Sequence, residues 1–320
     1  MKKNKLSLLI IFLCVSQLFL AQKKNSGVKY KRNKDKSVTF SYYSTMPSSV
    51  FIILKFKRLT NAFGDQVKKT VKGYSDVITT LNQINDDSGI GFSYSYKTFY
   101  GNLDKKPNHD FKYILPFKKN KTIKVRNLNY LGKKFGDKEP ENWKSFQFLT
   151  SPNDTVFAIR KGIVVKVIDE FKSDNSKTYG YKNKSNAIII EHEDGTLARY
   201  SVLKHKSLMV KVGDIVYPTA PIAIAGSYDK PENSQLRLSI YYLNERVKEY
   251  DFYAKKPTIS NQIHIYSYVN PLFYVDSNKI IKLEKNEVYT SFYDDSTIEV
   301  EMSKREGKKW KKKGLLVKRK

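Results

Sequence analysis

The chain has 320 residues, a formal net charge of +28 and one cysteine, Cys14. A single cysteine excludes a disulfide framework and a cysteine-ligated metal site within the chain. The strong positive charge favours anionic partners such as nucleic acid, anionic lipid head groups or acidic wall polymers. The length allows one large domain or two domains of ordinary size.

The N-terminus is typical of a secretory signal peptide, predicted at residues 1–21. Lys2, Lys3 and Lys5 form a positive start, and an apolar run follows from residue 6 to residue 21. This run is short for a membrane span but suits the hydrophobic part of a signal peptide. An uncleaved N-terminal anchor remains the alternative. The protein is therefore predicted to be exported, to the periplasm or outer envelope or beyond the cell, where nucleic acid is not an expected partner.

Runs of alternating apolar and polar residues predict β-strands along the chain, and so an all-β protein. In the first region these runs are 37–43, 50–56, 91–100, 112–117 and 122–130. They predict a β-sandwich-like domain at residues 23–132.

One stretch of that region is ambiguous. Val67, Val71, Tyr74, Ile78 and Leu81 fall on one face of a helix, although the glycine at position 73 disfavours a helix there. A helix and a pair of strands both remain open.

A polar stretch rich in turn formers, residues 133–142, predicts a linker. Beyond it the alternating runs are 156–168, 187–192, 196–202, 222–226, 236–243 and 263–269. They predict a second β domain at residues 143–275, followed by a C-terminal extension at 276–320.

The last part of the extension, residues 304–320, has ten basic residues and one acidic residue. This composition predicts a disordered or weakly helical tail. The tail either lies on anionic lipid or is a solvated run of charge without a partner.

The second domain contains short motifs with glycines at the turns. In chain order they are TVFA at 155–158, KGIVV at 161–165, NAIIIEH at 186–192, DGT at 194–196, YSVL at 200–203, KVGDIV at 211–216, PIAIAGS at 221–227 and LRLS at 236–239. In order and spacing this series resembles the core of the LytM/lysostaphin-type zinc metallopeptidases, which are peptidoglycan endopeptidases with a duplicated hybrid β motif. The resemblance implies an antiparallel β-sheet core. Residues 109–117 also look like a strand of the β domain that precedes this core in one exported branch of the family.

The resemblance further implies which positions hold zinc, and those positions have changed. The aspartate ligand aligns with Gln147, and the histidine ligand beside it aligns with Trp143, or with Lys138 if a longer spacing applies. The third ligand, the second histidine of an HxH strand, aligns with Arg237. The two catalytic histidines align with Val202 and Gln235.

Glutamine binds zinc poorly, and Arg237 brings a positive charge to the place of a dication. The family zinc is therefore predicted to be lost, and no cofactor is expected. Gln147, Val202, Gln235 and Arg237 are predicted to converge on one side of the sheet as a ligand groove. Arg237 either offers a forked donor to a carboxylate of the wall peptide or pairs with a nearby acidic residue as a remnant.

These observations predict a catalytically inactive, peptidase-like envelope protein that binds peptidoglycan or regulates a cell-wall hydrolase. Two alternatives remain open. The first is an active or weakly active peptidoglycan metalloendopeptidase, and the second is a structural surface or assembly protein.

Overall fold

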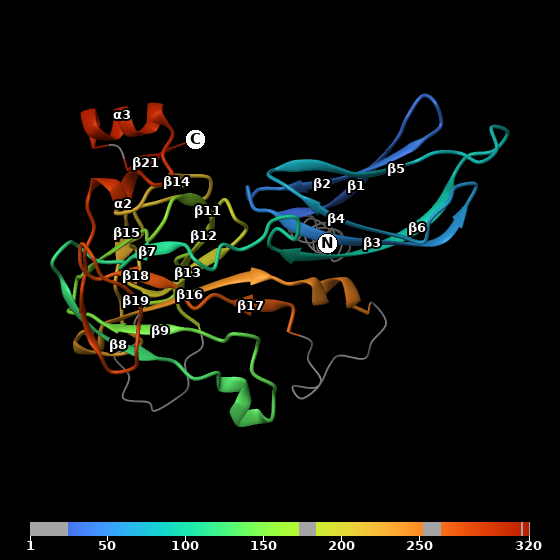
Figure 1. The fold of residues 1–320 in the computed structure, drawn as a ribbon. Helices are drawn as coiled ribbons and strands as arrows, with labels where there is room; N and C mark the ends of the chain where they lie inside the picture. Colours follow the sequence, from blue (N-terminus) through green and yellow to red (C-terminus); the bar gives the residue numbers. More distant parts are fainter. Residues whose placement is uncertain (1–24, 173–183, 252–263, 315, 320) are drawn as a thin grey trace, which may run out of the picture.

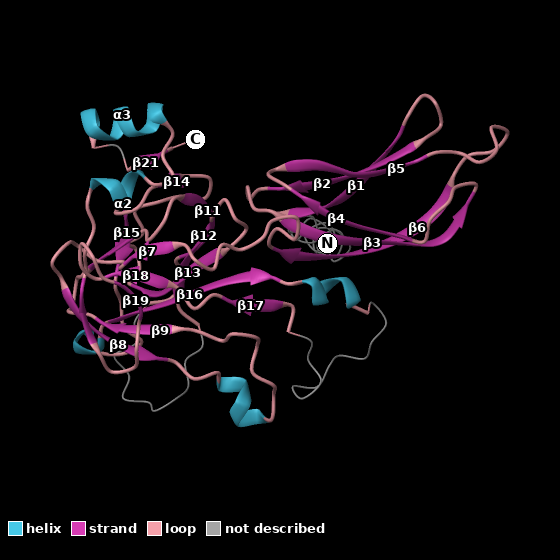
Figure 2. Cartoon of the chain, viewed as in Figure 1, coloured by secondary structure: helices cyan, strands magenta, loops and turns pink. Residues whose placement is uncertain are grey.

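A computed structural model describes residues 25–172, 184–251, 264–314 and 316–319. They form two β-rich units, and the chain passes from the N-terminal unit into a larger second unit (Figure 1). The fold is all-β, as predicted, and its few short helices lie outside the sheets (Figure 2). The predicted signal peptide lies outside the described residues. Within them, no helix is long and apolar enough to cross a membrane.

The N-terminal unit is a sandwich of two three-stranded antiparallel sheets, β1-β2-β5 and β4-β3-β6. The strands are β1 (Ser26–Arg32), β2 (Val38–Ser44), β3 (Val50–Thr60), β4 (Gln66–Val71), β5 (Ser75–Leu81) and β6 (Gly91–Tyr100). Phe40 from the first sheet and Ile52 and Leu54 from the second are fully buried in one shared core. The predicted β-sandwich-like fold of the N-terminal region is therefore confirmed, and its strands lie within residues 26–100.

The ambiguous stretch forms the two strands β4 and β5, joined at Gly73, which has a φ of 71°. Phe40 pairs with Thr79 and the next residue of β2 pairs with Val77, so Ile78 is an extra residue in a bulge. The bulge leaves the buried residues Ile78 and Leu81 three positions apart. A spacing of three imitates the period of a helix, which explains the ambiguity.

Strand β3 joins the two units because both of its faces are buried. Ile52 and Leu54 face the sandwich core, whereas Phe51 and Ile53 pack against the second unit. Their partners there include Leu243 and Val247.

The second unit is built on a ten-stranded antiparallel sheet with the order β20-β8-β9-β16-β13-β12-β11-β14-β21, and β17 also pairs with β16. Its strands are β8 (Thr122–Asn127), β9 (Phe146–Leu149), β11 (Gly162–Ile168), β12 (Asn186–Glu191), β13 (Leu197–Leu203), β14 (Ile215–Val216), β16 (Gln235–Leu243), β17 (Tyr266–Tyr268), β20 (Val288–Thr290) and β21 (Val317–Lys318). This sheet confirms the predicted antiparallel core.

Two small sheets complete the second unit. One pairs β10 (Thr155–Phe157) with β15 (Pro221–Ile224), and the other has the order β19-β18-β7. The strands of the latter are β7 (Lys112–Ile114), β18 (Leu272–Tyr274) and β19 (Ile280–Lys282), and β7 runs parallel to β18.

Parts of the chain outside 143–275 contribute to this unit. β8, from the region predicted as the first domain, pairs with β9 and with β20, and β20 comes from the C-terminal extension. The stretch predicted as a linker overlaps a short 3-10 helix, η2 (Leu131–Phe135). Two further 3-10 turns are η3 (Pro231–Asn233) and η4 (Glu245–Glu249).

The C-terminal extension also forms two helices, α2 (Asp295–Glu299) and α3 (Lys304–Lys313). The basic tail is thus an ordered helix over most of its length. Ser303 and Glu306 form a reciprocal capping box at its start, and Gly314, with a φ of 60°, ends it. Composition predicted a disordered or weakly helical tail, because composition does not register these two caps.

One face of the ten-stranded sheet covers the core of the second unit. In β16, Leu236 and Leu238 are fully buried in that core. Gln235, Arg237 and Ser239 alternate with them and therefore point to the opposite side. We call this opposite side the open face.

Candidate functional site

Residues of the open face are aligned across four strands by the register of the sheet. Arg126 of β8 pairs with Gln147 of β9, Gln147 pairs with Arg237 of β16, and Arg237 pairs with Ser201 of β13. Directly paired residues point to the same side of a sheet, so these four side chains form one row.

Three of the predicted groove residues are in contact. The Gln147 amide donates a hydrogen bond of 2.8 Å to Oε1 of Gln235, and Arg237 Nε donates to the same oxygen at 3.1 Å. The Arg237 guanidinium also lies 4.9 Å from the centre of the Tyr228 ring. Within the described part of the chain, no ion pair includes Arg237.

Val202, the fourth predicted residue, follows Ser201 and is connected to the cluster through the backbone. Its carbonyl accepts a hydrogen bond from Gly226 N, and the Gly226 carbonyl accepts one from Gln235 N, both at 2.8 Å. Val202 has a φ of 65°, which is strained for a β-branched residue. The buried Val202 side chain lines a neighbouring cavity rather than joining the amide–guanidinium contacts.

This cavity has a volume of about 590 Å³. Its lining includes Lys172, Lys184, Lys204 and His205 and contains no carboxylate among the described residues. Lys204 donates a hydrogen bond of 2.8 Å to the Asn153 side chain. The cavity is therefore basic, like the open face beside it.

Trp143, aligned with a family zinc ligand, lies apart from the cluster. Its indole donates a hydrogen bond of 2.9 Å to the Leu128 carbonyl, and its ring packs against Tyr130 and Tyr268. Lys138, the other position for this ligand, is exposed, and its carbonyl accepts a hydrogen bond from His264.

The side chains at the vacated positions do not fit a zinc ion. Catalytic zinc sites use three histidine, cysteine or carboxylate ligands, whereas this cluster offers two amides and a guanidinium. A guanidinium has no lone pair to donate and carries a positive charge. Among the described residues, no group of three or more His, Cys, Asp or Glu side chains is placed to hold a metal ion.

The sequence did not identify Arg199, which belongs to the same site. Arg199 pairs with Ser239, so it lies diagonally across from Arg237 on the open face. It is half-buried, and its charge acts to lower the pKa values of Tyr241 and Tyr268, which pair with each other across β16 and β17. Burial raises the pKa of Tyr241 to about 12 although Arg199 opposes the shift. The alternation along 196–202 placed Arg199 on the polar side of a strand, but only the register places it beside Arg237.

The open face is mainly cationic from β8 to β11. Its paired positions hold the cations Lys124, Arg126, Lys166, Arg199 and Arg237. Among the paired positions of this face, the acidic residue is Glu191 of β12. Its carboxylate accepts a hydrogen bond of 2.8 Å from Ser49 N in the N-terminal unit. This face therefore suits an anionic ligand.

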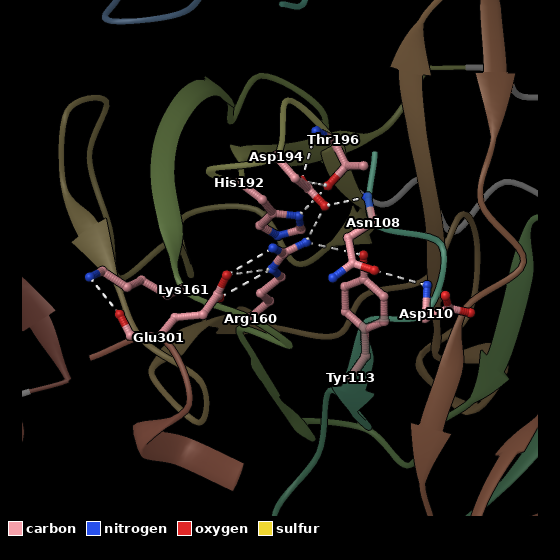
Figure 3. A network of polar contacts seen from close by, with 9 residues as sticks. All are labelled: Asn108, Asp110, Tyr113, Arg160, Lys161, His192, Asp194, Thr196 and Glu301. Atoms are coloured by element: carbon pink, nitrogen blue, oxygen red, sulfur yellow. Dashed lines mark hydrogen bonds and ion pairs between the residues drawn. The ribbon is translucent and has the colours of Figure 1, made fainter. Parts of the chain in front are cut away.

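A second polar cluster lies deep in the same unit (Figure 3). Arg160 donates to Asp194 at 2.7 Å and to Glu301 at 2.8 Å, and its guanidinium lies 3.7 Å from the centre of the Phe111 ring. His192 shares a hydrogen bond of 2.9 Å with Thr196. Burial would raise the pKa of Asp194, but Arg160 and the Thr196 hydroxyl lower it below its usual range. The charged groups of this cluster are largely buried and pair with one another, so the cluster is structural.

One protein family matches the part of the chain that contains most strands of the large sheet. Residues 141–249 match the family model of Peptidase family M23. No curated protein matches the chain.

Three solved structures are similar to this chain at low sequence identity. A zinc-containing peptidase from Vibrio cholerae is 14% identical with a TM-score of 0.25, and the match covers 68% of this chain and 75% of that one. Helicobacter pylori Csd3 is 7% identical with a TM-score of 0.28, covering 67% and 72%. A peptidase M23 candidate from Pseudomonas aeruginosa is 10% identical with a TM-score of 0.26, covering 67% and 87%. The part of the chain that matches the model of peptidase family M23, residues 141–249, includes the strands β9 to β16 and the positions Trp143, Gln147, Val202, Gln235 and Arg237.

Proposed function

We propose that this protein is a catalytically inactive M23-type protein of the bacterial envelope that binds peptidoglycan through the open face. The observation that supports it is the contact of Gln147 and Arg237, which align with family zinc ligands, with Gln235, which aligns with a catalytic histidine. A guanidinium at that place repels a dication and attracts a carboxylate.

The ligand chemistry follows from the charges. Stem peptides of peptidoglycan carry free carboxylates, and Arg237 and Arg199 lie diagonally across neighbouring strands with no acidic partner among the described residues. The Tyr228 ring adds an aromatic group beside Arg237. A buried arginine with a purely structural role usually pairs with an acidic residue. A carboxylate of the bound peptide can take that place here.

Sedimentation with purified peptidoglycan tests this proposal. Arg237→Ala should weaken binding by roughly tenfold or more, because a hydrogen bond to a charged group is lost. Arg237→Lys keeps the positive charge but loses the paired donors of the guanidinium. Its affinity should therefore lie between those of the wild type and Arg237→Ala. Arg246→Ala removes an exposed arginine on η4 and should leave binding unchanged. Equal binding by the wild type and Arg237→Ala would overturn the proposed site.

Metal analysis and a wall-digestion assay on the purified protein separate this proposal from the active endopeptidase. The expected result is no stoichiometric zinc and no release of soluble wall fragments. One zinc per chain, lost together with digestion on treatment with a chelator, would contradict inactivity.

The inactive protein could instead act by regulating a cell-wall hydrolase, which is a second function that we propose for it. It predicts that a hydrolase digests the wall at a different rate when this protein is added. The Arg237→Ala variant then shows whether the open face mediates the change.

A further inference from the structure

Helix α3 presents one strongly basic side to solvent. Six exposed basic residues at positions i, i+1, i+4, i+5, i+8 and i+9 share this side and together line a shallow groove of about 460 Å³. They are Lys304, Arg305, Lys308, Lys309, Lys312 and Lys313. We call them the cationic face.

The opposite side of α3 is anchored to the second unit. Glu306 forms an ion pair of 3.0 Å with Lys161 and accepts a hydrogen bond of 2.5 Å from the Tyr217 hydroxyl. Gly307 is buried, and Lys311 pairs with Glu299 of α2 at 2.7 Å. These contacts determine which side of the helix faces outward.

The chain is also held on both sides of α3. Before the helix, Glu301 pairs with the buried Arg160, and the Glu301 carbonyl accepts a hydrogen bond of 2.8 Å from Lys161 (Figure 3). After it, β21 pairs with β14 at the edge of the large sheet. The cationic face is therefore oriented before any partner binds, so binding requires little further ordering.

The charges of the cationic face are not compensated within the described chain. Among the described residues, the α3 residues that form ion pairs are Glu306 and Lys311, and neither belongs to the cationic face. Like charges four residues apart destabilise a helix. An anionic surface that neutralises them would relieve this repulsion.

We propose that the cationic face docks on a membrane that contains anionic phospholipid. α3 projects as a ridge at the outer edge of the molecule, on the far side of the second unit from the N-terminal unit (Figure 1). A flat anionic surface can contact all six residues of the cationic face at once, because they lie along one side of a single helix. Phospholipid phosphates attract each nearby lysine or arginine within a Debye length. This docking is separate from the wall binding proposed for the open face.

Vesicle sedimentation tests the docking. The described fold starts at residue 25, so a chain that starts at Gln22 keeps every described contact and lacks the apolar run, which would itself enter a bilayer. This chain should bind vesicles of phosphatidylglycerol and phosphatidylcholine in equal parts, and bind pure phosphatidylcholine vesicles far less. Raised salt should release it.

Charge reversal at the middle of α3 is the decisive variant. Lys308→Glu with Lys309→Glu should lower the affinity for anionic vesicles by more than roughly 30-fold, since each basic residue near the surface contributes to binding. The new glutamates lie four residues before Lys312 and Lys313, a favourable order for helical ion pairs, so the helix is retained. Circular dichroism and thermal unfolding check that the variant folds.

Lys133→Glu with Lys134→Glu is the matched control, because it changes the net charge equally at two exposed residues of η2. It should keep most of the affinity. An equal loss in both variants would mean that net charge alone drives binding, and no loss in the α3 variant would mean that the helix takes no part. Either result overturns the proposal, as would equal binding to the two kinds of vesicle.

Discussion

His192 is buried beside the ion pair of Arg160 and Asp194, and its Nε2 atom has no hydrogen-bond partner among the described residues. Burial lowers the pKa of His192 far below its ordinary value of 6.5, and the neighbouring Arg160 lowers it further. The imidazole is therefore neutral in the folded protein. Its Nδ1 atom shares a hydrogen bond of 2.9 Å with the Thr196 hydroxyl. The side chain therefore has a structural role in the core and no role in acid–base chemistry.

This buried histidine predicts a loss of stability in mild acid. Below pH 6.5 the unfolded chain binds a proton at His192 that the folded chain does not, so the free energy of unfolding falls as the pH falls. The loss should be roughly 2 kcal/mol between pH 6.5 and about pH 5. Urea unfolding at several pH values measures it. The His192→Asn variant should lose most of this slope, whereas substitution of the exposed His109 by Asn should retain it.

A wild-type slope in the His192→Asn protein would show that other groups cause the acid sensitivity. Asp194 acts in a separate and lower range. Its pKa is depressed below 3.8, so its stabilisation is complete above that value and is lost only as the pH falls below it.

At the scale of elements, α3 shows how a very basic segment becomes an ordered helix. The capping box at Ser303 satisfies backbone donors at its start, and Glu306 within that box also reaches Lys161 and Tyr217. Burial opposes ionisation of Glu306, but hydrogen bonds from Tyr217 and from Ser303 N, together with Lys161, lower its pKa to about 2. Glu306 thus anchors a helix of mostly basic residues to the second unit.

Replacement of Glu306 by alanine should therefore detach α3. The variant loses the cap and the anchor together, and the lysines at 308–313 should become faster sites of trypsin cleavage. Mass spectrometry of the early fragments measures the rate. Glu232→Ala, at an exposed position of η3, provides the control. Equal cleavage of all three proteins would mean that Glu306 does not hold the helix.

At the scale of the whole molecule, the two units share a core. Phe51 and Ile53 of β3 pack with Leu243 and Val247, and each of the four is at most 3% exposed. A covalent linker alone would leave the units free to move. This apolar contact and the hydrogen bond from Ser49 N to Glu191 instead join the sandwich to the large sheet.

Leu243→Ala should destabilise the protein by about 2–5 kcal/mol and uncouple the units. Calorimetry should show one transition in the wild type and two in the variant, because the shared core makes unfolding cooperative. Val288→Ala, at a side chain that is 54% exposed, should leave the single transition intact. One unchanged transition in Leu243→Ala would show that the units are coupled through other contacts.

Much of the fold can be predicted from local patterns. The long alternating runs became β2, β3, β6, β12, β13 and β16. The short strands β9, β14 and β18 to β21 were not predicted, because two to four residues carry too little alternation to be recognised. The run at 156–168 contains two strands, β10 and β11, separated by a turn that the apolar pattern does not show.

The sequence by itself determined the all-β class, the longer strands of both units and the similarity of the second unit to peptidase family M23. It also predicted that Gln147, Gln235 and Arg237 lie together on one side of the sheet. Only the tertiary structure decided that Arg199 joins them, that the open face has few carboxylates and that α3 is anchored by Glu306. The physical reason is that strand composition is a local property, whereas cross-strand register and helix docking depend on residues far apart in the chain.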